Sequence, residues 1–199
     1  MIEEQNFLFV GVGGQGVLTA SDIAAQVGID LGLDAKKSEV HGFSQRGGVV
    51  ESHIRWATRV GSPTCEKGTV DVLLAFELLE AARWIDWLKP GGDIIVNRQQ
   101  ITPMSVNLGQ AGYPDAEALL AALKKRAGRV ISVEALPLAE KAGNVRTINT
   151  VLLASLSTLL ETDPQLWENA ILQRVPKRYA EVNKVAFKLG QEAAQKSSK

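Results

Sequence analysis

The sequence contains very little cysteine and histidine, and this excludes several classes of site. Of its 199 residues, one is a cysteine, Cys65, and two are histidines. A single thiol cannot form an internal disulfide, and with two histidines it does not supply the ligand sets typical of zinc or iron–sulfur centres. If the protein takes part in redox chemistry, we expect the electron carriers to lie on another chain.

The sequence also lacks an excess of charge of either sign and lacks long hydrophobic runs. Lysine plus arginine and aspartate plus glutamate both number 22, so the formal net charge is +0, which argues against nucleic acid or an anionic membrane as the partner. Unbroken apolar stretches reach only about five residues, whereas a membrane span needs about 20, and the first residues have no basic segment typical of a signal peptide. We therefore expect a cytoplasmic protein.

The rest of the composition is that of a globular chain, with 45% hydrophobic and 22% charged residues. Domains typically have about 150 residues, so we expect a single domain over residues 1–199 with a helical extension at about 164–199. Residues 176–199 carry six cations against two acids. The basic helix expected there is either a partner surface or a solvated amphipathic helix.

Segments of strand and helix character alternate along the chain. Residues 7–10 form a continuous apolar run, typical of a strand covered on both faces, and residues 17–27 have helical periodicity. The other predicted strands are residues 49–56, 70–76, 93–96 and 129–133, and the other predicted helices are 77–88, 115–127, 136–142 and 147–160, with two more starting at Pro164 and Pro176. This alternation predicts the α/β class, as a Rossmann-like three-layer α/β/α sandwich with a C-terminal helical extension. The helix at 147–160 is apolar nearly all round, which predicts burial against the sheet or a partner.

A glycine loop lies between the first predicted strand and the first predicted helix. It reads Gly11-Val12-Gly13-Gly14-Gln15-Gly16. Glycine permits positive φ and lets backbone N–H groups approach a ligand closely. The unpaired N–H groups and dipole of the following helix favour a phosphate or carboxylate. We predict an anion-binding site formed by Gly11, Gly13, Gly14, Gln15 and Gly16, with a tight turn that binds no ligand as the alternative.

A nicotinamide cofactor needs a further acid that this sequence does not place correctly. In such sites an acid about 20 residues further on, at the end of the second strand, holds the ribose. Residues 34–41 read D-A-K-K-S-E-V-H, which is basic and hydrophilic, and no apolar strand precedes Glu39. A dinucleotide site is therefore disfavoured, and a free-standing dinucleotide-binding reductase is kept only as an alternative.

A second polar segment lies directly before the predicted strand at Val49. Ser44, Gln45 and Arg46 supply hydrogen-bond donors in a glycine-flexed loop, and the Arg46 guanidinium can fork onto a phosphate or carboxylate. Loops at the carboxyl ends of strands converge on one crevice in an α/β sheet, so this loop and the glycine loop could share a site. The alternative for Arg46 is a surface ion pair.

Other polar residues nearby have simpler interpretations. Lys36 and Lys37 add positive charge upstream of the second segment, although solvated lysines are the more common case. His41 and His53 have no carboxylate at ligand spacing, which favours hydrogen-bonded structural histidines over catalytic ones.

Three segments together carry a resemblance to a known family. They are the glycine loop, the run E-V-H-G-F-S-Q-R-G-G at 39–48 with the strand after it, and N-V-R-T-I-N at 144–149. In motif order, from residue 7 to about 187, the chain resembles the small subunits of indolepyruvate:ferredoxin oxidoreductases. More broadly, it is similar to the gamma domain of 2-oxoacid:ferredoxin oxidoreductases.

The resemblance implies a role in a complex that oxidatively decarboxylates aryl 2-oxoacids such as indolepyruvate to aryl-acetyl-CoA and passes electrons to ferredoxin. Thiamine diphosphate and the 4Fe–4S clusters would lie on a large partner subunit, and this chain, inactive alone, would enclose the site. It also implies that Gly13, Gly14, Gln15 and Gly16, with Ser44, Gln45, Arg46 and Gly47, contribute to coenzyme A binding. Pyruvate-type members tend to carry lysines at the positions of Gln45 and Arg46. A non-catalytic adaptor that docks on a partner is the remaining alternative.

Overall fold

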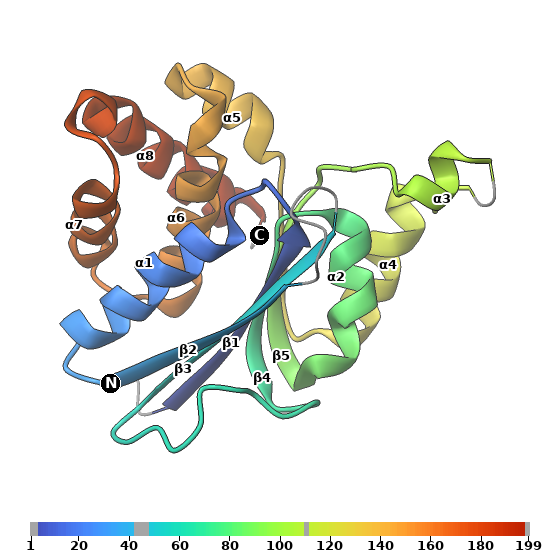
Figure 1. Ribbon diagram of the computed structural model, residues 1–199. Helices are drawn as coiled ribbons and strands as arrows, with labels where there is room; N and C mark the ends of the chain where they lie inside the picture. Colours follow the sequence, from blue (N-terminus) through green and yellow to red (C-terminus); the bar gives the residue numbers. More distant parts are fainter. Residues whose placement is uncertain (1–3, 42–47, 110–111, 198–199) are drawn as a thin grey trace.

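The computed structural model describes residues 4–41, 48–109 and 112–197, and it confirms the α/β class (Figure 1). The strands are β1 (Glu4–Val12), β2 (Asp34–His41), β3 (Val49–Ala57), β4 (Val70–Ala75), β5 (Leu88–Asn97) and β6 (Val130–Val133). They form one six-stranded sheet in the order β2-β3-β1-β4-β5-β6. β1, β4, β5 and β6 pair in parallel, while β3 runs antiparallel to both β1 and β2.

Five strands therefore end at the same side of the sheet, where β3 begins, and we call this side the carboxyl edge. The loops that follow parallel strands meet at such an edge, and ligands of open α/β sheets bind there. The glycine loop follows β1 and lies at the carboxyl edge.

Helices cover both faces of the sheet. The helices are α1 (Val17–Asp30), α2 (Leu78–Trp84), α3 (Met104–Asn107), α4 (Ala116–Arg126), α5 (Ala135–Ala142), α6 (Ile148–Leu160), α7 (Pro164–Arg174) and α8 (Ala180–Ser197), with short 3-10 turns at Ile85–Trp87, Val145–Thr147 and Lys177–Tyr179. One face carries α1, α5, α6, α7 and α8, and the other carries α2 and α4 (Figure 1).

The apolar run in β1 is explained by this double cover. Phe7 and Phe9 enter the core beneath α1 and α6, whereas Leu8 and Val10 enter the core beneath α2 and α4. Because successive strand residues point to opposite faces, a strand covered on both sides needs apolar residues at every position.

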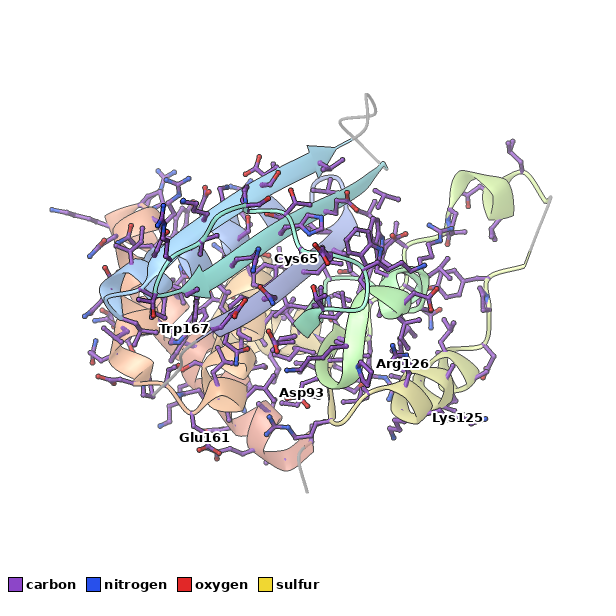
Figure 2. All side chains as sticks on the ribbon, turned by 90° about the horizontal axis from the view of Figure 1, so that it is seen from below. Cys65, Asp93, Lys125, Arg126, Glu161 and Trp167 are labelled. Carbon is purple, nitrogen blue, oxygen red and sulfur yellow. The ribbon has the colours of Figure 1, made fainter. Side chains whose placement is uncertain are left out.

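The two C-terminal helices are packed into the helical layer. α6 is buried as predicted, and α8 crosses it so closely that a Cβ added to Gly190 would lie 2.4 Å from the Val151 carbonyl oxygen. Trp167 of α7 is fully buried in the same core. Figure 2 shows Trp167 on the side of these helices and Arg126 at the end of α4, on the opposite side.

Two local features differ from the sequence-based expectation. Residues 34–41, for which we expected no apolar strand, form the edge strand β2, which pairs with β3 alone in the sheet. The strand predicted at 93–96 begins earlier, at Leu88, so Pro90-Gly91-Gly92 lies inside β5. The pairing is irregular there, since Val70 pairs with Leu88 and Val72 with Asp93. In the described residues, no helix is long and apolar enough to cross a membrane.

Candidate functional site

The glycine loop joins β1 to α1 by a tight turn that glycine alone accommodates without strain. Gly14 has φ +101° and Gly16, at the N-terminus of α1, has φ +79°. Both values lie in the region that side chains disfavour. A Cβ on Gly14 would meet open space, whereas one on Gly16 would lie 2.2 Å from Asn149 Nδ2. Gly14 therefore borders an opening, and Gly16 is enclosed by α6.

The N-terminus of α1 presents backbone donors that no described side chain caps. The helix begins at Val17, its first turn contains no acidic residue, and its Gly16 cap makes no side-chain hydrogen bond. In contrast, Glu77, Asp115 and Asp163 each cap their helices with a carboxylate. Uncapped N–H groups with a positive helix dipole favour an anion.

A hollow of about 400 Å³ opens beside this N-terminus. Its lining comes from three separate parts of the chain, and comprises Gly14, Gln15, Gly16, Gln99, Val145, Arg146, Ile148 and Asn149. We call this hollow the glycine-loop pocket. A second hollow of about 350 Å³ lies next to it at the ends of β5 and β6, and both are lined by Gln99.

Among the described lining residues of the glycine-loop pocket, Arg146 carries the positive charge. Its side chain is exposed and makes no hydrogen bond or ion pair with any described residue. Asn149, one turn further on, donates from Nδ2 to the Gly16 carbonyl oxygen at 3.1 Å and so fixes α6 against the glycine loop. An unpaired guanidinium beside uncapped N–H groups is suited to a phosphate or carboxylate.

Gln15 holds the loop in place through the protein itself. Its Oε1 accepts from Val12 N at 2.7 Å, and its Nε2 donates to the Phe76 carbonyl at 2.8 Å and to Gln99 Oε1 at 3.2 Å. These bonds tie together the ends of β1, β4 and β5. Gly11 is buried beneath Gln15, since a Cβ there would lie 2.8 Å from Gln15 Oε1.

The predicted second segment lies outside the described residues, so the positions of Ser44, Gln45, Arg46 and Gly47 stay predictions. The chain reaches them from the end of β2, and Gly48 on their far side accepts a 2.8 Å hydrogen bond from Gly13 N. Gly48, the first described residue after this segment, therefore lies beside the glycine loop.

Lys36 and Lys37 are held away from the pocket by contacts of their own. Lys37 forms ion pairs with Asp22 of α1 and Glu39 of β2, and Lys36 donates to the Val60 carbonyl at 2.6 Å. These contacts link β2 to the body of the protein, so neither lysine serves the glycine-loop pocket here.

The buried titratable groups near β3 are structural. His53 is buried, which lowers the pKa of its imidazole, and its Nδ1 accepts from Cys65 N at 3.3 Å. Burial raises the pKa of the Cys65 thiol to about 12, so it is a poor nucleophile. In the part of the chain that the structure describes, no group of three or more histidine, cysteine and acidic side chains could hold a metal ion.

Sequence reasoning missed Gln99, Arg146 and Asn149 as pocket residues. Arg146 and Asn149 lie in the N-V-R-T-I-N run that carried the family resemblance, but no local spacing connects that run to the glycine loop. Asn149 and Gly16 are 133 residues apart in the chain, and only the folded sheet brings them together.

The structure defines an α/β domain with a pocket at the carboxyl edge of its sheet, and comparison with known proteins identifies its class. The model of the pyruvate ferredoxin/flavodoxin oxidoreductase family matches residues 6–193. The chain therefore belongs to this family, as its motifs indicated.

The relatives within the family are oxidoreductase subunits. The chain is 36% identical over 196 residues to a Pyrococcus horikoshii protein named indolepyruvate oxidoreductase subunit IorB, covering 97% of each chain. The gamma subunit of a keto/oxoacid ferredoxin oxidoreductase from Geobacter sulfurreducens has the same fold, with a TM-score of 0.71, 25% identity and coverage of 96% of this chain and 99% of that one. A 2-oxoglutarate:ferredoxin oxidoreductase from Magnetococcus marinus, with coenzyme A bound, matches 98% of this chain at TM-score 0.75 and 19% identity, but only 31% of its own longer chain.

Proposed function

We propose that this chain is the small subunit of an indolepyruvate:ferredoxin oxidoreductase. In that complex an aryl 2-oxoacid is oxidatively decarboxylated, the acyl group is transferred to coenzyme A, and the electrons pass to ferredoxin. A larger subunit carries thiamine diphosphate and the iron–sulfur clusters. This chain encloses the reaction site and binds the phosphates of coenzyme A in the glycine-loop pocket.

One observation carries the proposal: the pocket has the chemistry of anion binding and lacks the groups that would perform a reaction. Backbone N–H groups at the α1 N-terminus and the Arg146 guanidinium supply donors and positive charge. The lining otherwise consists of amides, glycines and aliphatic side chains. It contains no described acid, histidine or cysteine to act as a general base or nucleophile.

The reaction itself explains why such a chain needs a partner. Loss of carbon dioxide from a 2-oxoacid leaves an electron pair on the former carbonyl carbon, and this pair needs an organic electron sink. Oxidation of that carbon then requires electron acceptors. With one cysteine in the whole sequence, buried and with a raised thiol pKa, this chain does not supply cluster ligands. Thiamine diphosphate and the clusters accordingly belong to the larger subunit.

The names of the relatives favour an aryl substrate. The Pyrococcus horikoshii relative is named for indolepyruvate and matches this chain over nearly its full length. In the proposed complex the aryl group meets the larger subunit, while this chain contacts the anionic end of coenzyme A.

The test is purification of the native complex followed by assay. We expect the chain to co-purify with a larger, iron-containing subunit and the complex to reduce a viologen dye with indolepyruvate only when coenzyme A is present. The isolated chain should be inactive and should bind neither NADH nor flavin by calorimetry. A complex that gives no indolepyruvate-dependent reduction, or saturable NADH binding by the isolated chain, would contradict the proposal.

A further inference from the structure

A segment between β5 and α4 leaves the body of the molecule at the carboxyl edge. We call residues 102–109, which include the single turn of α3, the arm. Figures 1 and 2 both show it projecting away from the sheet and from the helical layers. Leu108, directly after α3 in the arm, is 64% exposed, the highest value among the exposed large hydrophobic side chains of the described residues.

The arm is set apart by composition as well as by position. Residues 99–114 contain no lysine, arginine, aspartate or glutamate, in a chain in which 22% of residues are charged. Exposed segments are usually charged or polar, and a contiguous exposed apolar surface marks an interaction site. An uncharged arm that carries an exposed leucine fits an apolar socket on a protein and offers no cation to a nucleic acid or a lipid headgroup.

The base of the arm is fixed by one buried carboxylate. Glu77 is 1% exposed, and its Oε1 accepts both from Ile101 N at 3.0 Å, on one flank of the arm, and from the Tyr113 hydroxyl on the other. Its Oε2 accepts from Glu80 N at 2.9 Å, at the start of α2. Burial, together with the neighbouring Glu77 carboxylate, raises the pKa of Tyr113, so the phenol stays protonated and donates. The direction of the arm is therefore set by the body of the protein.

The same base connects the arm to the glycine-loop pocket. The backbone oxygen of Gln99 accepts a hydrogen bond from Leu78 N. The side chain of Gln99 lines the pocket and accepts a hydrogen bond from Gln15. A partner that grips the arm is thereby aligned with the pocket mouth.

Other exposed hydrophobic side chains surround the same edge. Val40 and Val49 lie where β2 ends and β3 begins, Leu136 lies at the start of α5, and Val145 lines the pocket. The remaining two exposed large hydrophobic side chains of the described residues lie elsewhere: Ile29 on α1 and Val185 on α8. Apolar surface is thus concentrated around the pocket, where a partner carrying the reaction centre must approach.

We propose that the arm is the docking element by which this chain seats on the larger subunit of its oxidoreductase, with Leu108 entering an apolar socket of that subunit. This rests on the proposed function. It is supported by the name of the Pyrococcus horikoshii relative, which is called a subunit, and by the Magnetococcus marinus chain, in which the same fold covers 31% of a longer polypeptide and is therefore joined to further chain. The arm makes no extensive packing with the other described helices and strands, as expected for a segment that a partner covers.

The test compares Leu108→Lys with the matched control Ile29→Lys, which places the same charge at a side chain that is 52% exposed on α1. Each variant is titrated with the larger subunit obtained from the native complex, and binding is measured by interferometry. We expect Leu108→Lys to weaken assembly by roughly 10- to 100-fold, as for loss of a buried leucine anchor, and Ile29→Lys to bind as the wild type does. Circular dichroism melts of both variants should match that of the wild type.

A turnover measurement separates docking from chemistry. At saturating larger subunit, Leu108→Lys should regain wild-type turnover and wild-type dependence on coenzyme A. Wild-type affinity of Leu108→Lys for the larger subunit, or turnover that stays low once assembly is complete, would overturn the docking role and leave the proposed function intact. Failure of the wild-type chain to bind the larger subunit would overturn the proposed function and the docking role together.

Discussion

Replacing Arg146 by glutamine tests whether the glycine-loop pocket binds phosphate. The guanidinium is exposed and has no partner among the described residues, so its loss removes no internal contact. The free energy of unfolding should therefore change by less than about 0.5 kcal/mol, as for ordinary surface substitutions. Any effect on the ligand is then an effect on binding.

The expected size of that effect follows from charge-assisted hydrogen bonding. Such a bond contributes about 1.5–3 kcal/mol, and each 1.4 kcal/mol corresponds to about a tenfold change in Kd. We expect Arg146→Gln to raise the Kd of the complex for coenzyme A by about 10- to 150-fold. The lower end applies if solvent at the pocket mouth screens the pair, and the effect should shrink as salt is added. The Kd of the Arg146→Lys variant should lie between those of the wild type and of Arg146→Gln, because lysine keeps the positive charge but loses the planar guanidinium.

The assay is calorimetric titration of coenzyme A into the assembled complex at low and high salt. Arg59→Gln is the matched control, since Arg59 is also exposed but follows β3 at the opposite edge of the sheet. A change in Kd of less than twofold for Arg146→Gln, or an equal change for Arg59→Gln, would show that Arg146 does not bind a phosphate of coenzyme A.

Three further predictions concern the body of the fold. Burial raises the pKa of Glu51, so the wild type gains stability as pH falls through the folded pKa of this carboxyl. Glu51→Gln should therefore raise the free energy of unfolding at pH 7 but not at pH 3, and a gain that persists at pH 3 in urea melts would contradict this. Gly190→Ala forces α8 away from the Val151 carbonyl and should lower the free energy of unfolding by about 1–2 kcal/mol. The control Gly61→Ala places its Cβ in open space and should leave the melting temperature unchanged. The Cys65 thiol, with a pKa of about 12, should react with iodoacetamide only after unfolding, and rapid labelling of the native chain would argue against its burial.

The sequence-based prediction was most successful where the signal is local. The apolar run of β1, the glycines after it and the periodicity of α1 adjoin one another, so strand, loop and helix were predictable together. Their position at the carboxyl edge followed from the alternation of strands and helices.

Features set by distant contacts were not predictable in the same way. β2 carries few apolar residues because it is an edge strand, and its identity as a strand comes from pairing with β3. The arm contains one helical turn, too short to leave a periodic signal. Arg146 enters the pocket because α6 packs against the glycine loop, through a contact that no spacing in the sequence encodes.

In the proposed complex, backbone N–H groups of the glycine loop and the first turn of α1 bind the phosphates of coenzyme A. Hydrogen exchange of the complex, followed by mass spectrometry with and without coenzyme A, is the most direct test of this contact. We expect coenzyme A to slow exchange in peptides covering residues 11–20, and Arg146→Gln to weaken this protection at a fixed concentration of coenzyme A. Unchanged exchange in these peptides, at a concentration of coenzyme A that supports full turnover, would contradict it.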